Sequence, residues 1–249
     1  MNFKRISAVF LKHLYTTKKI PERWFDMFYW PFFTLLFWWM TSKFLTDNSE
    51  LMMVVIGSIM LWAVFYRSQL DINAYLLDDF DVLSQINWYA SPLKMSELIA
   101  GTLLFGLARS FVMILVLVGI CSFVFSISLP VSAIFIPIMF ALLLFAYAVS
   151  IAIAGITLRI GTKIQSLSWG IAIALQPLSA VTHPLSAMPY YLQKIALLLP
   201  TTYVFEAFRQ NSIYIALRGL DISIIYLIIS LVIFAYFFRK ALKAGTLIR

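Results

Sequence analysis

The sequence predicts an all-α integral membrane protein with about six transmembrane helices. Three observations support this fold class. Of the 249 residues, 62% are hydrophobic and only 12% are charged, long apolar runs recur along the chain, and the basic residues flank those runs. The prediction adds two elements that do not span a membrane, namely an amphipathic interface helix at the N-terminus and a broken re-entrant segment before the last helix.

The composition excludes an ordinary soluble domain, in which about a quarter of the residues are charged. A soluble chain this apolar could not cover its surface with polar groups, so the excess apolar surface is expected to face membrane lipid. The formal net charge of +8 does not indicate a nucleic-acid partner, because the basic residues border apolar runs and form no separate basic face. We treat residues 1–249 as a single transmembrane domain.

Each expected span is an apolar run near the length of about 20 residues that a transmembrane helix needs. Barrel strands would alternate in polarity with a period of two, and these runs do not, so helices are the expected spanning elements. The six expected spans cover residues 26–44, 51–66, 98–125, 131–158, 164–181 and 222–238.

The basic residues also predict the orientation of the chain. Most of the 19 lysines and arginines fall in segments 1–23, 67–97, 159–163 and 239–249, and few fall in the segments between. Because loops rich in Lys and Arg stay on the cytoplasmic side, both termini are expected in the cytoplasm. We therefore predict an even number of crossings of the plasma (inner) membrane.

The first expected non-spanning segment covers residues 1–23. Phe3, Ile6, Phe10 and Leu14 recur at helical spacing with basic residues between them, which is typical of an amphipathic helix lying in the membrane interface. Pro21 is expected to break this helix before the first span. The alternative is a disordered basic tail.

The second expected non-spanning segment is a cytoplasmic loop over residues 67–97. Its central part combines apolar and acidic residues in one short stretch, which predicts a helix on which a cytoplasmic partner could dock. The alternative is a solvated acidic loop that only keeps away from the membrane. The residues that would form the contact are Leu76, Leu77, Asp78, Asp79, Phe80 and Asp81.

The third expected non-spanning segment covers residues 182–221 on the external side. Pro184, Pro189 and Pro200 divide it into apolar pieces that are too short to cross a bilayer. Such proline-broken pieces are typical of re-entrant or interfacial helices.

No pattern of residues in this chain predicts catalysis, a metal site or a bound cofactor. Cys121 is the only cysteine, and the two histidines fall on opposite predicted sides of the membrane. A phosphate-binding loop needs a Lys after its last glycine, whereas Gly101 and Gly106 at that spacing are followed by Leu107. The chain is therefore not expected to be an enzyme.

A few charged residues near or within the expected spans are candidates for a structural or pathway role, because charge in a membrane is costly. Asp26 lies at the cytoplasmic end of the first span, and Arg109 lies well inside the third. Arg109 is expected to face the protein interior and to find a carboxylate or carbonyl groups. Glu206 and Arg209 are three residues apart, so they can pair across one helical turn.

Two stretches of the sequence form recognisable motifs. One is the segment before the last span, with Gln176 to Ala180, Pro184 to Pro189, Pro200, Tyr203, Glu206 and Arg209. The other is Ser91-Pro92-Leu93 followed by Glu97 and Gly101, at the start of the third span. Both stretches resemble the ABC type-2 permeases, the membrane subunits of bacterial and archaeal exporters. The number of expected spans and the amphipathic N-terminus are similar as well.

The resemblance implies a subunit that forms a pathway with a second copy of this chain and docks on two ABC ATPase subunits. ATP and Mg²⁺ would bind to those ATPase chains and not to this one. Residues 76–81 would form the coupling helix, residues 1–23 the interface helix, and the segment from Pro184 to Pro200 the cap of the outer mouth. The implied cargo is a drug, a lipid or a lipid-linked glycan.

Two other classes remain as alternatives. A stand-alone channel or an ion-coupled carrier would need ionisable residues grouped within the membrane, and in the sequence only Arg109 approaches this condition. An intramembrane enzyme would need paired catalytic groups at one depth, and the sequence suggests no such pair.

Overall fold

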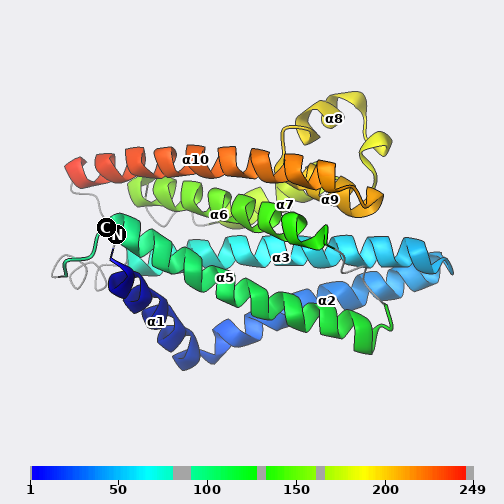
Figure 1. Cartoon of the computed structure of the whole chain (residues 1–249), viewed down its shortest axis with the longest axis horizontal. Helices are drawn as coiled ribbons and strands as arrows, with labels where there is room; N and C mark the ends of the chain where they lie inside the picture. The colour runs from blue at the N-terminus through cyan, green and yellow to red at the C-terminus, as the bar shows by residue number, and fades with distance from the viewer. Residues whose placement is uncertain (1, 81–90, 128–132, 161–165, 245–249) are drawn as a thin grey trace.

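The computed structural model describes residues 2–80, 91–127, 133–160 and 166–244, and these are mostly helical, with no strand among them (Figure 1). The all-α prediction is therefore confirmed for the described part of the chain. The helices are α1 (Phe3–Lys19), α2 (Pro21–Leu45), α3 (Ser49–Asp79), α5 (Met95–Gly119) with the π-helical turn η1 (Ile120–Val124), α6 (Phe135–Ile160), α7 (Leu167–Leu178), η3 (Leu185–Ala187), α8 (Tyr190–Ala196), α9 (Pro200–Gln210) and α10 (Ile213–Ala244).

Four helices are long and apolar enough to cross a membrane, namely α3, α5 with η1, α6 and α10. They contain 31, 30, 26 and 32 residues. At about 1.5 Å per residue, each exceeds the hydrocarbon thickness of about 30 Å. These four helices give the molecule the character of a membrane protein.

The expected first and fifth spans differ from these four. α2 has 25 residues, but its four Trp rings and its charged residues near both ends lower its hydropathy, so its crossing of the membrane stays a prediction. α7 has 12 residues, which reach only about 18 Å. As described, α7 is therefore too short to cross the hydrocarbon core alone.

The helix α6 forms the centre of the bundle and packs against both α3 and α10 (Figure 1). A close approach of α6 and α10 depends on Gly155, where an added Cβ would lie 2.8 Å from the Cα of Phe234. In α6, 67% of the most apolar stretch is buried, against 17% in α10. The outer face of α10 is therefore an apolar surface suited to lipid.

The expected amphipathic helix at the N-terminus is present as α1, and its position in a membrane interface stays a prediction. Of the four residues Phe3, Ile6, Phe10 and Leu14, only Ile6 is buried. The buried residues of α1 are Ile6, Val9, His13 and Thr17. Two of these four, His13 and Thr17, are polar. The face of α1 that packs against the bundle therefore differs from the apolar face that the sequence pattern indicates.

The expected loop over residues 67–97 needs a correction at its start. α3 does not end near Tyr66 but continues without a break to Asp79, which adds about 20 Å of helix. Polarity rises at Arg67, yet the helix persists because the charged and polar side chains of this stretch find partners within the fold. α5 then begins at Met95, and residues 81–90 lie outside the described residues.

The segment expected over residues 182–221 contains the short helices η3, α8 and α9, and then the first turns of α10. The last long helix thus begins at Ile213 and not at residue 222. Asn211 adopts a left-handed backbone with φ of 49° and ends α9, a conformation that Asn tolerates better than most residues. The proline-broken helices are present, and their re-entrant position in a membrane stays a prediction.

Candidate functional site

Charged and polar side chains from α1, α2, α3 and α5 gather at the end of the bundle where α1 packs. We call this group the polar network. It lies beyond the apolar part of α3, at the same end as the last turns of α10 (Figure 1). Its members are Lys12, His13, Thr17, Arg23, Asp26, Arg67, Asp71, Tyr75, Asp78, Asp79, Thr102 and Arg109.

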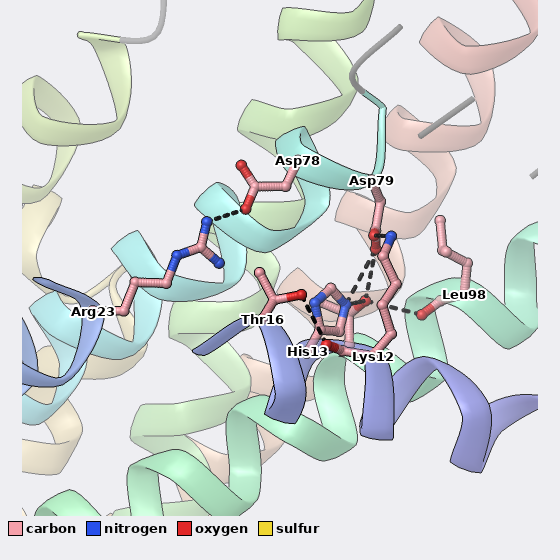
Figure 2. Close-up of polar contacts among 8 residues, drawn as sticks. Lys12, His13, Thr16, Arg23, Asp78, Asp79 and Leu98 are labelled. Atoms are coloured by element: carbon pink, nitrogen blue, oxygen red, sulfur yellow. Dashed lines mark hydrogen bonds and ion pairs between the residues drawn. The ribbon is translucent and has the colours of Figure 1, made fainter. Parts of the chain in front are cut away.

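Asp79, on the last turn of α3, is the centre of one half of the network (Figure 2). Its Oδ1 forms an ion pair with Lys12 Nζ, and its Oδ2 lies 3.2 Å from His13 Nε2. The Thr102 hydroxyl donates to Oδ2 over 3.4 Å and lies 3.1 Å from the same imidazole nitrogen. One buried carboxylate therefore joins α1, α3 and α5.

Arg109 is the centre of the other half. Its Nε lies 2.9 Å from Asp71 Oδ2, and its two terminal nitrogens donate to the Tyr75 hydroxyl and to the Arg23 carbonyl. Asp71 also pairs with Arg67, whose Nη2 lies 3.0 Å from Oδ1. Arg109 thus faces the protein interior with a carboxylate and a carbonyl as partners, as expected from its place in the sequence.

The two halves meet at Tyr75. Its hydroxyl accepts from Arg109 and lies 2.8 Å from the Thr17 hydroxyl of α1, and its ring lies beside the His13 ring, with 4.9 Å between centroids. A displacement of α1 must therefore disturb groups on both α3 and α5.

Two further ion pairs form the rim of the network. Arg23 pairs with Asp78 (Figure 2), and Arg67 Nη2 lies 3.7 Å from Asp26 Oδ2. The carboxylates of Asp26 and Asp78 are 38% and 48% exposed, so solvent screens these pairs and each contributes little to stability.

Glu97 provides a separate link between α1 and α5. One carboxylate oxygen accepts from the Asn2 amide over 2.7 Å, and the other accepts from the Lys94 amide over 3.0 Å. Arg5 completes this link by donating to the Pro92 carbonyl over 2.6 Å. The first residues of both helices are therefore held together by hydrogen bonds.

The residues expected to couple to an ATPase have different environments. Leu76, Asp79 and Phe80 are buried, and the Phe80 ring packs near Phe234 and Phe238 of α10. Leu77 is half-buried and Asp78 is exposed, so these two remain open to a partner. Asp81 lies outside the described residues.

Glu206 and Arg209 lie at the opposite end of the bundle, far along the chain from the network. Arg209 Nη1 lies 3.1 Å from Glu206 Oε1, the pairing across one turn that their spacing indicates. Arg209 also donates to the Ala180 and Val181 carbonyls, and Glu206 accepts from the Leu185 amide over 2.8 Å. Burial lowers the pKa of the Arg209 guanidinium, and the Glu206 carboxylate opposes this change. The pair fixes the segment after α7 onto α9.

A cavity of about 310 Å³ opens between α2, α3 and α7. Trp30, Trp62 and Trp169 supply aromatic faces, while Asp26 and Arg67 place charge at its wall. Two of these rings, Trp30 and Trp169, are largely exposed. The cavity therefore combines flat apolar surfaces with a polar edge, a lining that suits an amphipathic molecule.

Sequence reasoning missed His13, Thr17, Tyr75 and Thr102, the residues that connect the charged members of the network. His13 and Thr17 follow Val9 at intervals of four, so helical spacing was the available signal. Because these residues are polar, an apolar periodicity does not include them. Among the residues that the structure describes, no group of three His, Cys, Asp or Glu side chains could hold a metal ion.

No protein-family model matches the chain, and no curated protein matches it. The class of protein therefore rests on the helices themselves, four of which are long and apolar enough to span a membrane.

Proposed function

We propose that this chain is the transmembrane subunit of an ATP-driven exporter of the ABC type-2 class, embedded in the plasma (inner) membrane with both termini in the cytoplasm. In this proposal it couples a cargo pathway to two separate ATPase subunits and performs no chemistry itself. A second copy of the chain completes the pathway.

The observation that carries the proposal is the unbroken course of α3 from its apolar part to Asp79. A continuous helix transmits a displacement at one end to the other, because its backbone hydrogen bonds resist bending. The polar network fastens α1 and α5 to the same end of α3. A partner that pushes on this end therefore moves three helices together, which is the mechanical requirement of a coupling element.

The cavity between α2, α3 and α7 is the proposed contact for cargo. Its tryptophan faces suit the stacking of a sugar or a drug ring, and Asp26 with Arg67 suits a polar group on the same molecule. A drug, a lipid or a lipid-linked glycan would each meet both requirements.

The test is a pull-down of the tagged protein in detergent, with ATPase activity measured on the eluate. An ATPase is expected to co-purify with the wild type in about equal amount. Leu77→Asp adds a charge to the half-exposed face at the end of α3 and is expected to lower the recovered ATPase at least fivefold. Leu198→Asp is the matched control, because Leu198 is 65% exposed at the opposite end.

Equal ATPase recovery from wild type and Leu77→Asp would reject the coupling contact. A protein that purifies without any ATP turnover would reject the exporter class. Phe80→Asp is unsuitable for this test, because Phe80 is 1% exposed and a buried charge would damage the fold itself.

A second candidate is an ion-coupled carrier, which the grouping of Asp71, Arg67 and Arg109 favours. The sequence placed only Arg109 within a span, whereas in the structure Arg109 pairs with Asp71, which also pairs with Arg67. In this case Asp71→Asn would abolish ion flux into liposomes that hold the purified chain alone. An exporter subunit alone would show no such flux in the wild type.

A further inference from the structure

A second cavity, of about 450 Å³, opens at the end of the bundle opposite the polar network, where η3, α8, α9 and the start of α10 meet (Figure 1). Its volume falls within the range of about 300–1,000 Å³ that small-molecule sites occupy. Of its eleven described lining residues only three, Leu185, Leu197 and Ile215, are aliphatic. The lining is therefore mainly polar and aromatic, which distinguishes this cavity from an apolar surface that lipid tails would cover.

Hydrogen bonds and a close helix contact hold the walls of this cavity in place. The Leu185 amide donates to Glu206 Oε1 over 2.8 Å, which fixes η3 on α9. The Tyr203 hydroxyl donates to the Leu197 carbonyl over 3.0 Å, which fixes the end of α8 on α9. α10 approaches the same face of α9, since an added Cβ at Gly219 would lie 3.1 Å from Tyr203 Cβ. The cavity is thus formed before any ligand binds, which lowers the free-energy cost of binding.

Arg218, on α10, gives the cavity a positive charge. Glu206 is the only acidic residue among the described residues that line it, and its carboxylate already accepts from Arg209 over 3.1 Å and from Gln210 over 2.9 Å. Arg218 is exposed and belongs to none of the ion pairs of the described residues. Its guanidinium lies 5.6 Å from the centre of the Tyr214 ring. The N–H groups of Arg218 are therefore available to an anion, and their planar array suits a phosphate.

Other polar groups of the lining suit hydroxyl groups on the same ligand. Gln193 and Gln210 use their amide nitrogens to donate to the Met188 carbonyl and to Glu206. No hydrogen bond within the described part of the chain reaches their amide oxygens, so these two oxygens can accept from a ligand. The exposed Ser186 hydroxyl can both donate and accept.

We propose that this cavity binds a phosphate that carries a hydroxylated group, as in a sugar phosphate. Arg218 contacts the phosphate, and the amide oxygens of Gln193 and Gln210 accept from hydroxyl groups. A bare phosphate would leave most of the cavity to solvent, because 450 Å³ is about fifteen times the volume of about 30 Å³ that one water molecule takes up. A soluble sugar phosphate and the headgroup of an inositol lipid share this chemistry. The proposal does not depend on coupling to an ATPase, so the chain is tested alone.

The test is equilibrium dialysis of the full chain, in nanodiscs of dioleoyl phosphatidylcholine, against radiolabelled glucose 1-phosphate. The wild type should bind it roughly tenfold more tightly than glucose, which lacks the charge that Arg218 recognises. Arg218→Gln should remove this difference by weakening the binding of glucose 1-phosphate roughly tenfold. Lys194→Gln is the matched control and should leave binding unchanged. Lys194 also lies over a tyrosine four residues earlier, Tyr190, but it does not line the cavity.

Ser186→Phe tests the cavity itself, because the larger ring fills part of the space. Ser186 and Arg218 are both exposed, so both variants should keep the wild-type Tm, while Ser186→Phe also weakens the binding of glucose 1-phosphate. Phosphatidylinositol added to the nanodiscs separates the two sources of ligand. Competition with glucose 1-phosphate would assign the site to a lipid headgroup, and undisturbed binding would assign it to a soluble ligand.

Two results would overturn the proposal. One is the absence of measurable binding of glucose 1-phosphate to the wild type. The other is an equal Kd of the wild type and Arg218→Gln for this ligand, which would show that Arg218 does not contact a phosphate.

Discussion

At the scale of single residues, Asp78 and Asp79 show how a helix gives adjacent carboxylates opposite environments. Adjacent residues on a helix point about 100° apart, and here one carboxylate meets solvent while the other meets α1 and α5. The Asp79 carboxylate is 1% exposed beside Lys12 and His13, whereas that of Asp78 is 48% exposed beside Arg23. The same substitution at the two positions therefore compares the stability contributed by a buried ion pair with that contributed by a surface ion pair.

We expect Asp79→Asn to destabilise the protein by about 3 kcal/mol, because it leaves the buried His13 and Thr102 side chains without their charged partner. Asp78→Asn should change stability by less than about 1 kcal/mol. The measurement is the Tm of each variant in detergent. A similar Tm for both variants would show that the Asp79 cluster does not hold α1 in place.

Arg109→Lys is expected to destabilise the protein by about 2 kcal/mol, because an ammonium cannot reach Asp71, Tyr75 and the Arg23 carbonyl together. Arg159→Lys serves as the control, since Arg159 is exposed at the end of α6. Thermal unfolding of the two purified variants decides the matter. Equal stability of the Arg109→Lys and Arg159→Lys variants would show that the positive charge of Arg109 matters but the geometry of its guanidinium does not.

At the scale of elements, the contact between α1 and α5 depends on a close approach of their backbones. An added Cβ at Gly101 would lie 2.6 Å from Val9 Cβ and 2.9 Å from the Ile6 carbonyl oxygen. The carbonyl oxygen belongs to the backbone of α1, so relief requires a shift of the whole helix. Gly101 therefore sets the distance at which the polar network can form.

Gly101→Ala is expected to destabilise the docking of α1 by about 1–3 kcal/mol through this overlap. The same helix offers a matched control in Gly119→Ala, where an added Cβ meets nothing within 4 Å and the better helix propensity of Ala is neutral to favourable. Limited proteolysis near Ile20, together with the Tm, reports the release of α1. Equal resistance of both variants would contradict the tight contact.

At the scale of the whole molecule, the first turn of α1 and the last turns of α10 lie at one end of the bundle, and α8 lies at the other (Figure 1). The single cysteine, Cys121, is buried. The native thiol should therefore react little with maleimide reagents, so the protein suits the labelling of introduced cysteines.

We expect Lys19→Cys and Lys243→Cys to react with a membrane-impermeant maleimide only after the membrane is opened, because both positions lie on the proposed cytoplasmic side. Asp47→Cys and Tyr191→Cys should react in intact cells, since both are exposed at the opposite end. Labelling of Lys19→Cys and Lys243→Cys from different sides would exclude an orientation with both termini on the same side of the membrane. Labelling of both from outside would invert the proposed topology.

The sequence by itself determined the helical class, the membrane character and the approximate position of the four long apolar helices, because each depends on local composition and length. It also predicted the amphipathic helix α1 and the pairing of Glu206 with Arg209, since both follow from helical spacing. These features need no knowledge of what lies across the fold.

Only the tertiary structure decided which face of α1 packs and how far α3 continues. Both depend on contacts between residues far apart in the chain, such as His13 with Asp79 and Thr17 with Tyr75. A polar residue lowers the mean hydropathy of a segment. The same residue is stable inside the fold when a side chain from another helix forms a hydrogen bond or an ion pair with it. For this reason, hydropathy placed a loop after Tyr66 where paired polar side chains sustain a helix to Asp79.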